Sequence, residues 1–158
     1  MRKIMLGAAG LLLAAAAGST PVDGVNASMR VEPRAGRLLV HMTAENRGAR
    51  TIYVPVAVFG EHELFGKHFE VRKSASGAPL DYIGPMVKRG PLGKDDYIAV
   101  KPHGKRRNTV DITRAYAFLP GTHRYRISYA GQAVADLAQL EQAGTLVPEP
   151  VEFSYAAK

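Results

Sequence analysis

The sequence predicts an all-β protein, an immunoglobulin-like antiparallel β-sandwich of about seven to nine strands. Three observations support this fold class. Short runs of alternating apolar and polar residues recur along the chain, and turn-forming residues separate them at intervals of about eight to twelve residues. One aromatic-rich stretch, 110–129, also has the order of elements expected where a chain crosses from one sheet of a sandwich to the other.

The stretch 110–129 is the most informative part of the chain. It begins as a strand at Val110, continues through 113–118, where we expect one short helical turn, and turns at Pro120-Gly121. Apolar and polar residues alternate from Tyr125 onward, which is typical of a half-buried strand. Tyr125 stands where a tyrosine corner would begin such a strand, and the favoured interpretation of the aromatic residues here is that they fill the core.

The first residues predict export. Arg2-Lys3 precede an apolar run from Ile4 to Ala17, and small residues follow, which together are typical of a secretory signal peptide over 1–18. The apolar run is too short for a stable membrane anchor, so no anchor is expected after cleavage. We therefore expect residues 19–158 to form a single exported domain, periplasmic or secreted, with Ala27 as a less favoured cleavage site.

Composition narrows the functional classes. The chain has no cysteine, which excludes disulfides, thiol catalysis and cysteine-ligated metals. Its formal net charge is +7, and the basic residues gather at Lys88-Arg89 and at 101–107. The excess charge favours solubility or attraction to an acidic envelope component. A solvated hairpin is the favoured interpretation of 101–107, and contact with an acidic partner is the alternative. Nucleic acid is not expected, because no stacking aromatic residues interleave with the basic cluster. The residues that we assign to this contact are Lys88, Arg89, Lys101, Lys105, Arg106 and Arg107.

The individual strands follow from alternation between turns. Val56 to Phe59 is expected to extend the strand before it, Leu80 to Val87 is a broken extended segment, and 131–144 is either a short amphipathic helix or a loop. The remaining strands are expected near 25–31, 38–44, 51–54, 69–71, 97–100, 108–112, 125–129 and 151–155.

Parts of the chain resemble the N-terminal β-sandwich region of deuterolysin-type metalloendopeptidases, the aspzincins, which include the peptidyl-Lys enzymes. The resemblance covers roughly 29–131. It includes a Phe-x-Val strand at Phe69, a Tyr-x-Gly-x-x-x-Lys-Arg run from Tyr82 to Arg89, and the run VDITRAYAF from Val110 to Phe118. The resemblance implies a pro- or accessory region. For Asp111, Tyr116, Phe118 and Tyr125 we expect structural roles.

The catalytic half of those peptidases is not expected here. Their zinc site needs a His-Glu-x-x-His helix, whereas the nearest match in this chain places His62 and His68 six residues apart. Positions separated by six residues point to different sides of a helix, and Gly66 weakens any helix there. We therefore expect no peptidase activity, no catalytic residues and no cofactor.

A metal site is the main alternative. His62 and His68, with Glu63 and neighbouring carboxylates, would supply nitrogen and oxygen ligands. A solvated polar loop is the favoured interpretation, because no two histidines show a known ligand spacing.

Two functional hypotheses follow. The first is an exported non-catalytic binding domain, acting as chaperone or inhibitor of a separately encoded protease. The second is a periplasmic metal-binding module that uses His62, His68 and nearby glutamates. An unrecognised enzyme is least favoured, for want of a nucleophile–base constellation.

Overall fold

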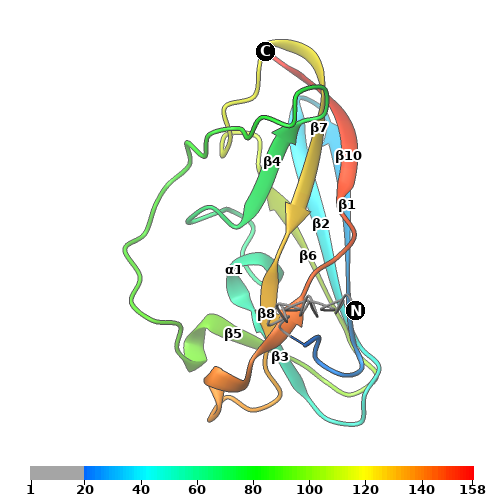
Figure 1. The fold of residues 1–158 in the computed structure, drawn as a ribbon, viewed down its shortest axis with the longest axis vertical. Helices are drawn as coiled ribbons and strands as arrows, with labels where there is room; N and C mark the ends of the chain where they lie inside the picture. The colour runs from blue at the N-terminus through cyan, green and yellow to red at the C-terminus, as the bar shows by residue number, and fades with distance from the viewer. Residues whose placement is uncertain (1–19) are drawn as a thin grey trace, which may run out of the picture.

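The computed structural model describes residues 20–158, so the predicted signal peptide (1–18) lies outside the described residues. Short strands dominate the chain (Figure 1). They are β1 (Val25–Arg34), β2 (Arg37–Asn46), β3 (Ile52–Pro55), β4 (Phe69–Lys73), β5 (Tyr97–Val100), β6 (Lys105–Asp111), β7 (Gly121–Tyr129), β8 (Gly131–Ala133), β9 (Gly144–Leu146) and β10 (Val151–Ala157). The other elements are α1 (Val56–Phe59), η1 (Lys94–Asp96) and η2 (Leu140–Gln142).

The strands form two layers. One layer is the antiparallel sheet β1-β2-β6, and the other is the antiparallel sheet β10-β7-β4. Two smaller pairs, β3-β5 and β8-β9, lie at the end of the molecule where β7 runs on into β8 (Figure 1). These pairs are joined because Tyr53 and Val134 exchange two backbone hydrogen bonds. The predicted all-β, sandwich-like fold is confirmed.

Alternation along the strands builds the core. Leu38, Val40 and Met42 of β2 are fully buried, and the residues between them are partly exposed. Tyr125 and Ile127 of β7 bury the same way from the opposite layer. Because both sets belong to one hydrophobic cluster, the two sheets pack face to face over a shared interior.

The crossover between the layers contains the expected turn. Ala115 donates its backbone N–H to the carbonyl of Ile112 at 3.0 Å, which closes a tight turn within 112–115 without a helix. The hydroxyl of Tyr125 then accepts the backbone N–H of Leu119 at 3.1 Å. This contact reaches back to the loop before β7, as in a tyrosine corner, although Tyr125 lies in the middle of β7 (Gly121–Tyr129) and not at its start.

The structure corrects one local expectation and refines two others. Val56–Phe59 is not a strand extension but the helix α1, because the backbone N–H groups of Gly60 and Glu61 both donate to the carbonyl of Val56. Of the two alternatives for 131–144, the amphipathic helix is not formed: the segment begins with β8, continues mainly as a loop that contains the single turn η2, and ends at Gly144, the first residue of β9. The three-residue strands β8 and β9 raise the strand total of the described residues to ten. In the basic stretch 101–107, residues 101–104 form a turn and only the last three residues belong to β6, which begins at Lys105.

Two buried asparagines connect separate segments of the chain through side-chain hydrogen bonds. The side-chain amide of Asn108 donates to the carbonyls of Val58 and Glu61, and that of Asn46 donates to those of Arg50 and Val100. Buried polar groups are tolerated when they are hydrogen-bonded in this way. Within residues 20–158, no helix has the length and apolar character needed to span a membrane.

Candidate functional site

A long connection from β4 to β5 carries the most exposed apolar surface of the described chain. We call its residues 81–96 the tethered loop; it arches away from the sheets and ends in η1 (Figure 1). Four of the six large hydrophobic side chains that are exposed in residues 20–158 lie on it. They are Ile83 (62%), Met86 (74%), Val87 (49%) and Leu92 (53%). Grouped apolar exposure of this kind marks interaction sites.

Tyr82 holds the first end of the loop. Its hydroxyl accepts the backbone N–H of Gly66 at 3.1 Å and lies 2.8 Å from the carbonyl of Pro85 and 3.3 Å from that of Leu64. Its ring packs edge-on against Tyr116, with ring centroids 5.5 Å apart. The loop therefore starts from a fixed point.

Gly84 is required beside that anchor. A Cβ atom at position 84 would lie 2.6 Å from the hydroxyl oxygen of Tyr82. Real Cβ contacts essentially never come this close, so any larger residue would displace the Tyr82 ring from its hydrogen bonds. The glycine lets the chain pass directly over the tyrosine.

Arg89 holds the second end. Its guanidinium lies 3.2 Å from a carboxylate oxygen of Asp96 and 3.9 Å from one of Glu61, in the segment after α1. Asp96 also accepts the backbone N–H of Gly93 at 2.8 Å, which caps the turn into η1. The loop is thus fixed on both sides of the residues that it displays.

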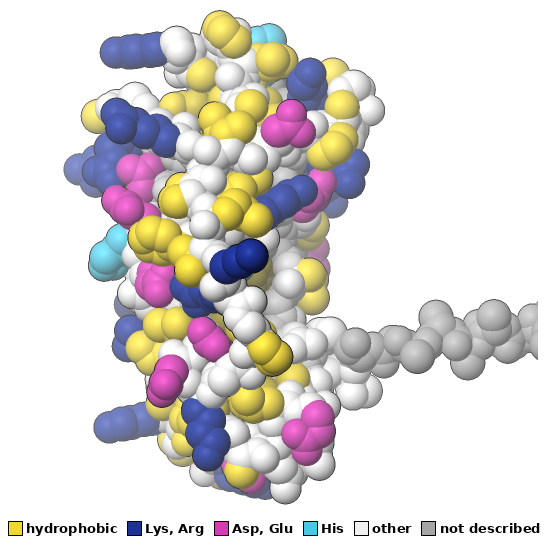
Figure 2. All heavy atoms as spheres, turned by 90° about the vertical axis from the view of Figure 1, so that its left-hand side faces the viewer, with side chains coloured by type: hydrophobic (Ala, Val, Ile, Leu, Met, Phe, Trp, Pro, Cys, Tyr) yellow, Lys and Arg dark blue, Asp and Glu magenta, His cyan; other side chains and the backbone are white. Residues whose placement is uncertain are grey.

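The residues between the anchors combine apolar and cationic side chains. Lys88 is exposed and has no ion pair among the described residues, and the same holds for Lys94 at the far end of the loop. The face that the loop crosses shows hydrophobic side chains interleaved with basic and acidic ones (Figure 2). The exposed apolar side chains of the loop, with Lys88 and Lys94 beside them, suit a partner with apolar and acidic groups.

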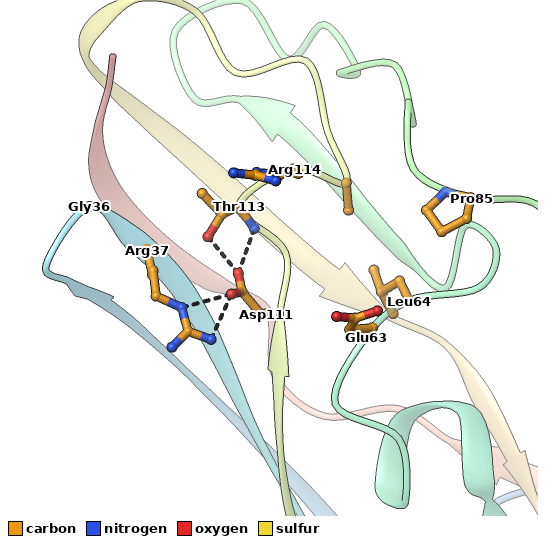
Figure 3. Close-up of a pocket in the computed structure, with 9 residues that line it drawn as sticks. Gly36, Arg37, Glu63, Leu64, Pro85, Asp111, Thr113 and Arg114 are labelled. Carbon is orange, nitrogen blue, oxygen red and sulfur yellow. Dashed lines mark hydrogen bonds and ion pairs between the residues drawn. The ribbon is translucent and has the colours of Figure 1, made fainter.

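A pocket of about 560 Å³ adjoins the start of the tethered loop. It is bordered by the start of β2, the segment before β4 and the end of β6, and Pro85 of the loop forms part of its wall (Figure 3). Leu64 and Ala115, both buried, supply apolar wall. The charged side chains at the pocket are Arg37, Glu63, Asp111 and Arg114.

Asp111 organises one wall of the pocket. Its carboxylate accepts hydrogen bonds from the backbone and hydroxyl of Thr113 and from the Arg37 guanidinium, whose nearest nitrogens lie 2.8 Å away (Figure 3). Burial raises the pKa of Asp111, but these hydrogen bonds outweigh it and hold the pKa below its ordinary value of 3.8. The carboxylate of Asp111 therefore already has its hydrogen-bond partners within the fold.

Tyr116 and Phe118 lie in the packed interior beside this wall. Tyr116 is 2% exposed, and Phe118 packs edge-on against Tyr116, Tyr125 and Tyr155. With Asp111 and Tyr125, these are the residues for which the sequence predicts structural roles.

The two histidines proposed as metal ligands, His62 and His68, share no hydrogen-bond partner among the described residues. His62 is exposed and its Nδ1 lies 3.1 Å from the carbonyl of Thr109. His68 is half-buried, and its Nε2 has no hydrogen-bond partner in the described chain. Desolvation, and secondarily the charge of Arg89, lower the pKa of His68 below 6.5. Glu63 is exposed and borders the pocket.

Among residues 20–158, no group of three or more His, Asp or Glu side chains is arranged to hold a metal ion. The metal-binding alternative for His62, His68 and Glu63 stays a prediction. Zinc and copper titrations test it directly, and binding no tighter than millimolar would end it.

The predicted basic contact residues do not form one surface. Lys88 and Arg89 lie on the tethered loop, whereas 101–107 lies on the opposite side of the molecule (Figure 1). Two of the latter are engaged: Lys105 lies 3.8 Å from Glu45, and Arg106 donates to the carbonyl of Phe59. Lys101 and Arg107 are exposed without ion pairs among the described residues.

The apolar residues of the loop were missed by sequence reasoning. Ile83, Met86 and Val87 belong there to the broken extended segment at 80–87, and Leu92 lies beyond it. A signal was present, since glycines and prolines at 84–93 interrupt any strand and so leave these side chains without a sheet to pack on.

Fold and site together define an all-β, sandwich-like protein with a tethered apolar and cationic loop beside a polar pocket. No family model matches the sequence, and no curated protein matches it. Nine chains of solved structures match. One is the X-ray structure of Northeast Structural Genomics Consortium target SoR45, at 11% identity and a TM-score of 0.49, over 85% of this chain and 88% of that one.

Proposed function

We propose that this protein is an exported, non-catalytic binding domain and that the tethered loop is its contact surface. The observation that carries the proposal is the exposure of Met86 and Val87 on a segment held at both ends. An apolar side chain left in water contributes about 1.5–3 kcal/mol when a partner buries it. Because the loop is already held in place, less conformational entropy is lost on binding.

The resemblance to aspzincin accessory regions supports a separately encoded protease as the partner, which this domain would help to fold or hold inactive. Lys88 and Lys94, beside the apolar residues, favour a partner face that is acidic around an apolar centre. An acidic envelope component is the alternative partner, and it would need the basic residues more than the apolar ones.

Affinity capture with matched variants tests this proposal. Immobilised residues 19–158 are exposed to an extract of exported proteins, alongside the Met86→Ser/Val87→Ser double variant. Val147→Ser serves as control, because Val147 is 60% exposed and belongs to the segment after β9, not to the loop. We expect a metallopeptidase to be retained by the wild type and the control, and to be weakened about tenfold or more by the double variant.

Two outcomes would contradict the proposal. Retention of the same proteins by all three columns would show that the apolar residues of the loop take no part. Salt-sensitive retention of acidic polymers, lost in Lys88→Ser and kept in Met86→Ser/Val87→Ser, would assign the loop to the envelope instead.

A further inference from the structure

We infer that the pocket beside the tethered loop binds short peptides with a free amino end and a free carboxyl end. The inference rests on the charges that border the pocket and is independent of the protein-binding role proposed for the loop. The volume of about 560 Å³ falls within the range of small-molecule sites.

Two of the four charged side chains at the pocket neutralise each other. Arg37 and Asp111 form an ion pair with nitrogen–oxygen distances of 2.8 Å, and Thr113 adds two more hydrogen bonds to the carboxylate. This pair is satisfied within the fold, so a ligand gains little from it. It forms a fixed polar wall.

The other two charged side chains are unpaired. Neither Glu63 nor Arg114 has a hydrogen bond or ion pair through its side chain among residues 20–158. They come from different segments and lie at different ends of the pocket, Glu63 beside Leu64 and Arg114 above Thr113 (Figure 3). The pocket therefore offers one free carboxylate and one free guanidinium.

This pair selects the class of ligand. A simple anion would meet Glu63, and a simple cation would meet Arg114, so either would gain one attraction and one repulsion. A dipolar ligand satisfies both, with its ammonium toward Glu63 and its carboxylate toward Arg114. Guanidinium groups bind carboxylates through two parallel hydrogen bonds, which favours this orientation.

The apolar wall favours a peptide over a more polar zwitterion. Leu64 and Ala115 are buried behind the pocket, and Pro85 closes it from the side of the loop. A peptide with one aliphatic side chain places that side chain against this wall while its ends reach the two charges. We assign the pocket to di- and tripeptides of this kind.

The probe is the tripeptide Ala-Leu-Ala, compared with its N-acetylated form and its C-terminal amide. Binding is followed by two-dimensional NMR titration of the labelled protein, in the backbone amide signals of Leu64, Thr113 and Ala115. We expect the free tripeptide to bind, and each blocked form to bind about tenfold more weakly, as for the loss of one charge-assisted hydrogen bond.

Variants assign each end of the peptide. Glu63→Gln should abolish the preference for a free amine and keep the preference for a free carboxylate, and Arg114→Gln should do the reverse. Glu141→Gln is the matched control, because Glu141 is exposed and borders neither the loop nor this pocket. Both pocket side chains are exposed, so the variants should fold, which thermal unfolding verifies.

Equal binding of the three tripeptides, or no shift at these amides up to millimolar concentrations, would overturn the inference. The Met86→Ser/Val87→Ser variant should bind the tripeptide as the wild type does, because neither residue borders the pocket. A failure of the loop as a contact surface is thereby distinguished from a failure of the pocket.

Discussion

The hydroxyl of Tyr116 contacts both backbone polar atoms of Phe69. It donates to the Phe69 carbonyl at 2.7 Å and accepts the Phe69 N–H at 3.2 Å. Phe69 begins β4, whose partner strand is β7, so Tyr116 supplies the hydrogen bonds that a second neighbouring strand would otherwise give at this point. The aromatic residue of the crossover thereby fastens the edge of the second sheet.

Replacing Tyr116 by Phe should lower the free energy of unfolding by about 1–3 kcal/mol, because it leaves two buried backbone groups without partners. Urea denaturation at neutral pH measures the change. Tyr53→Phe is the control, since no hydrogen bond of the Tyr53 hydroxyl is found in the described chain, and it should be close to neutral. Equal losses in the two variants would deny the hydroxyl of Tyr116 this role.

Gly84→Ala should release the first anchor of the tethered loop, because the added methyl group would lie 2.6 Å from the Tyr82 hydroxyl. We expect trypsin to cleave after Lys88 or Arg89 several-fold faster than in the wild type. In Gly90→Ala the methyl group meets no atom within 4 Å, so the cleavage rate should stay near that of the wild type. Identical rates in the two variants would mean that Tyr82 does not restrain the loop.

Acid should destabilise the protein through His68. Desolvation and the charge of Arg89 lower its pKa in the folded state below 6.5, the value expected for the unfolded chain. Between these two pKa values the unfolded chain holds more protons, so the free energy of unfolding falls as the pH is lowered through 6.5. His68→Gln should lessen this slope between pH values of about 7 and 5.

His103→Asn provides the comparison for the acid experiment. His103 is exposed in the turn before β6 with a φ of 57°, which asparagine tolerates. The free energy of unfolding is measured by denaturation at each pH for the wild type and for both variants. The prediction for His68 fails if both variants keep the full slope.

Alkali should destabilise the protein through Tyr116 and Tyr129. Burial raises the pKa of both phenols well above 10.0, and nearby charges add to the rise. Above a pH of about 10 the unfolded chain loses protons that the folded chain keeps, so the free energy of unfolding falls as the pH rises. Tyr129→Phe should show a shallower fall in denaturation experiments at pH values of about 9 to 11. An unchanged dependence would contradict this assignment.

The sequence predicts the sheets well where both faces of a strand are distinguishable. In β2 the buried and partly exposed residues alternate without a break, and the expected strand at 38–44 lies within Arg37–Asn46. The same holds for β7, whose buried residues begin at Tyr125. In a half-buried strand the apolar residues face the core and the polar residues face solvent, so the alternation in the sequence is enough to predict the strand.

Elements that depend on distant partners were not predictable in this way. Val56 to Phe59 is four apolar residues after a proline, a run too short to separate helix from strand by period. The strands β8 and β9 have three residues each, and they are fixed by pairing with each other and by the contact of Val134 with Tyr53. Three residues are too few to show an alternating pattern, so strands this short cannot be predicted from the sequence when their pairing partners are distant.

In the candidate site, too, the residue types could be predicted from the sequence, whereas their contacts depend on distant segments. Lys88 and Arg89 were singled out from the sequence as contact residues, but the anchor that Arg89 forms with Asp96 and Glu61 depends on the folded chain. Glu63 and Arg114 come to one pocket only because the segment before β4 lies beside the end of β6.

The anchoring of the loop has a consequence for how such a chain could change over time. Tyr82 and Arg89 hold the loop through contacts with the body that lie outside the displayed residues. Substitutions at Met86, Val87 or Lys88 would alter what the protein recognises while the interior stays as it is. Recognition and folding are encoded in separate parts of the sequence, so new specificities could arise on an unchanged scaffold.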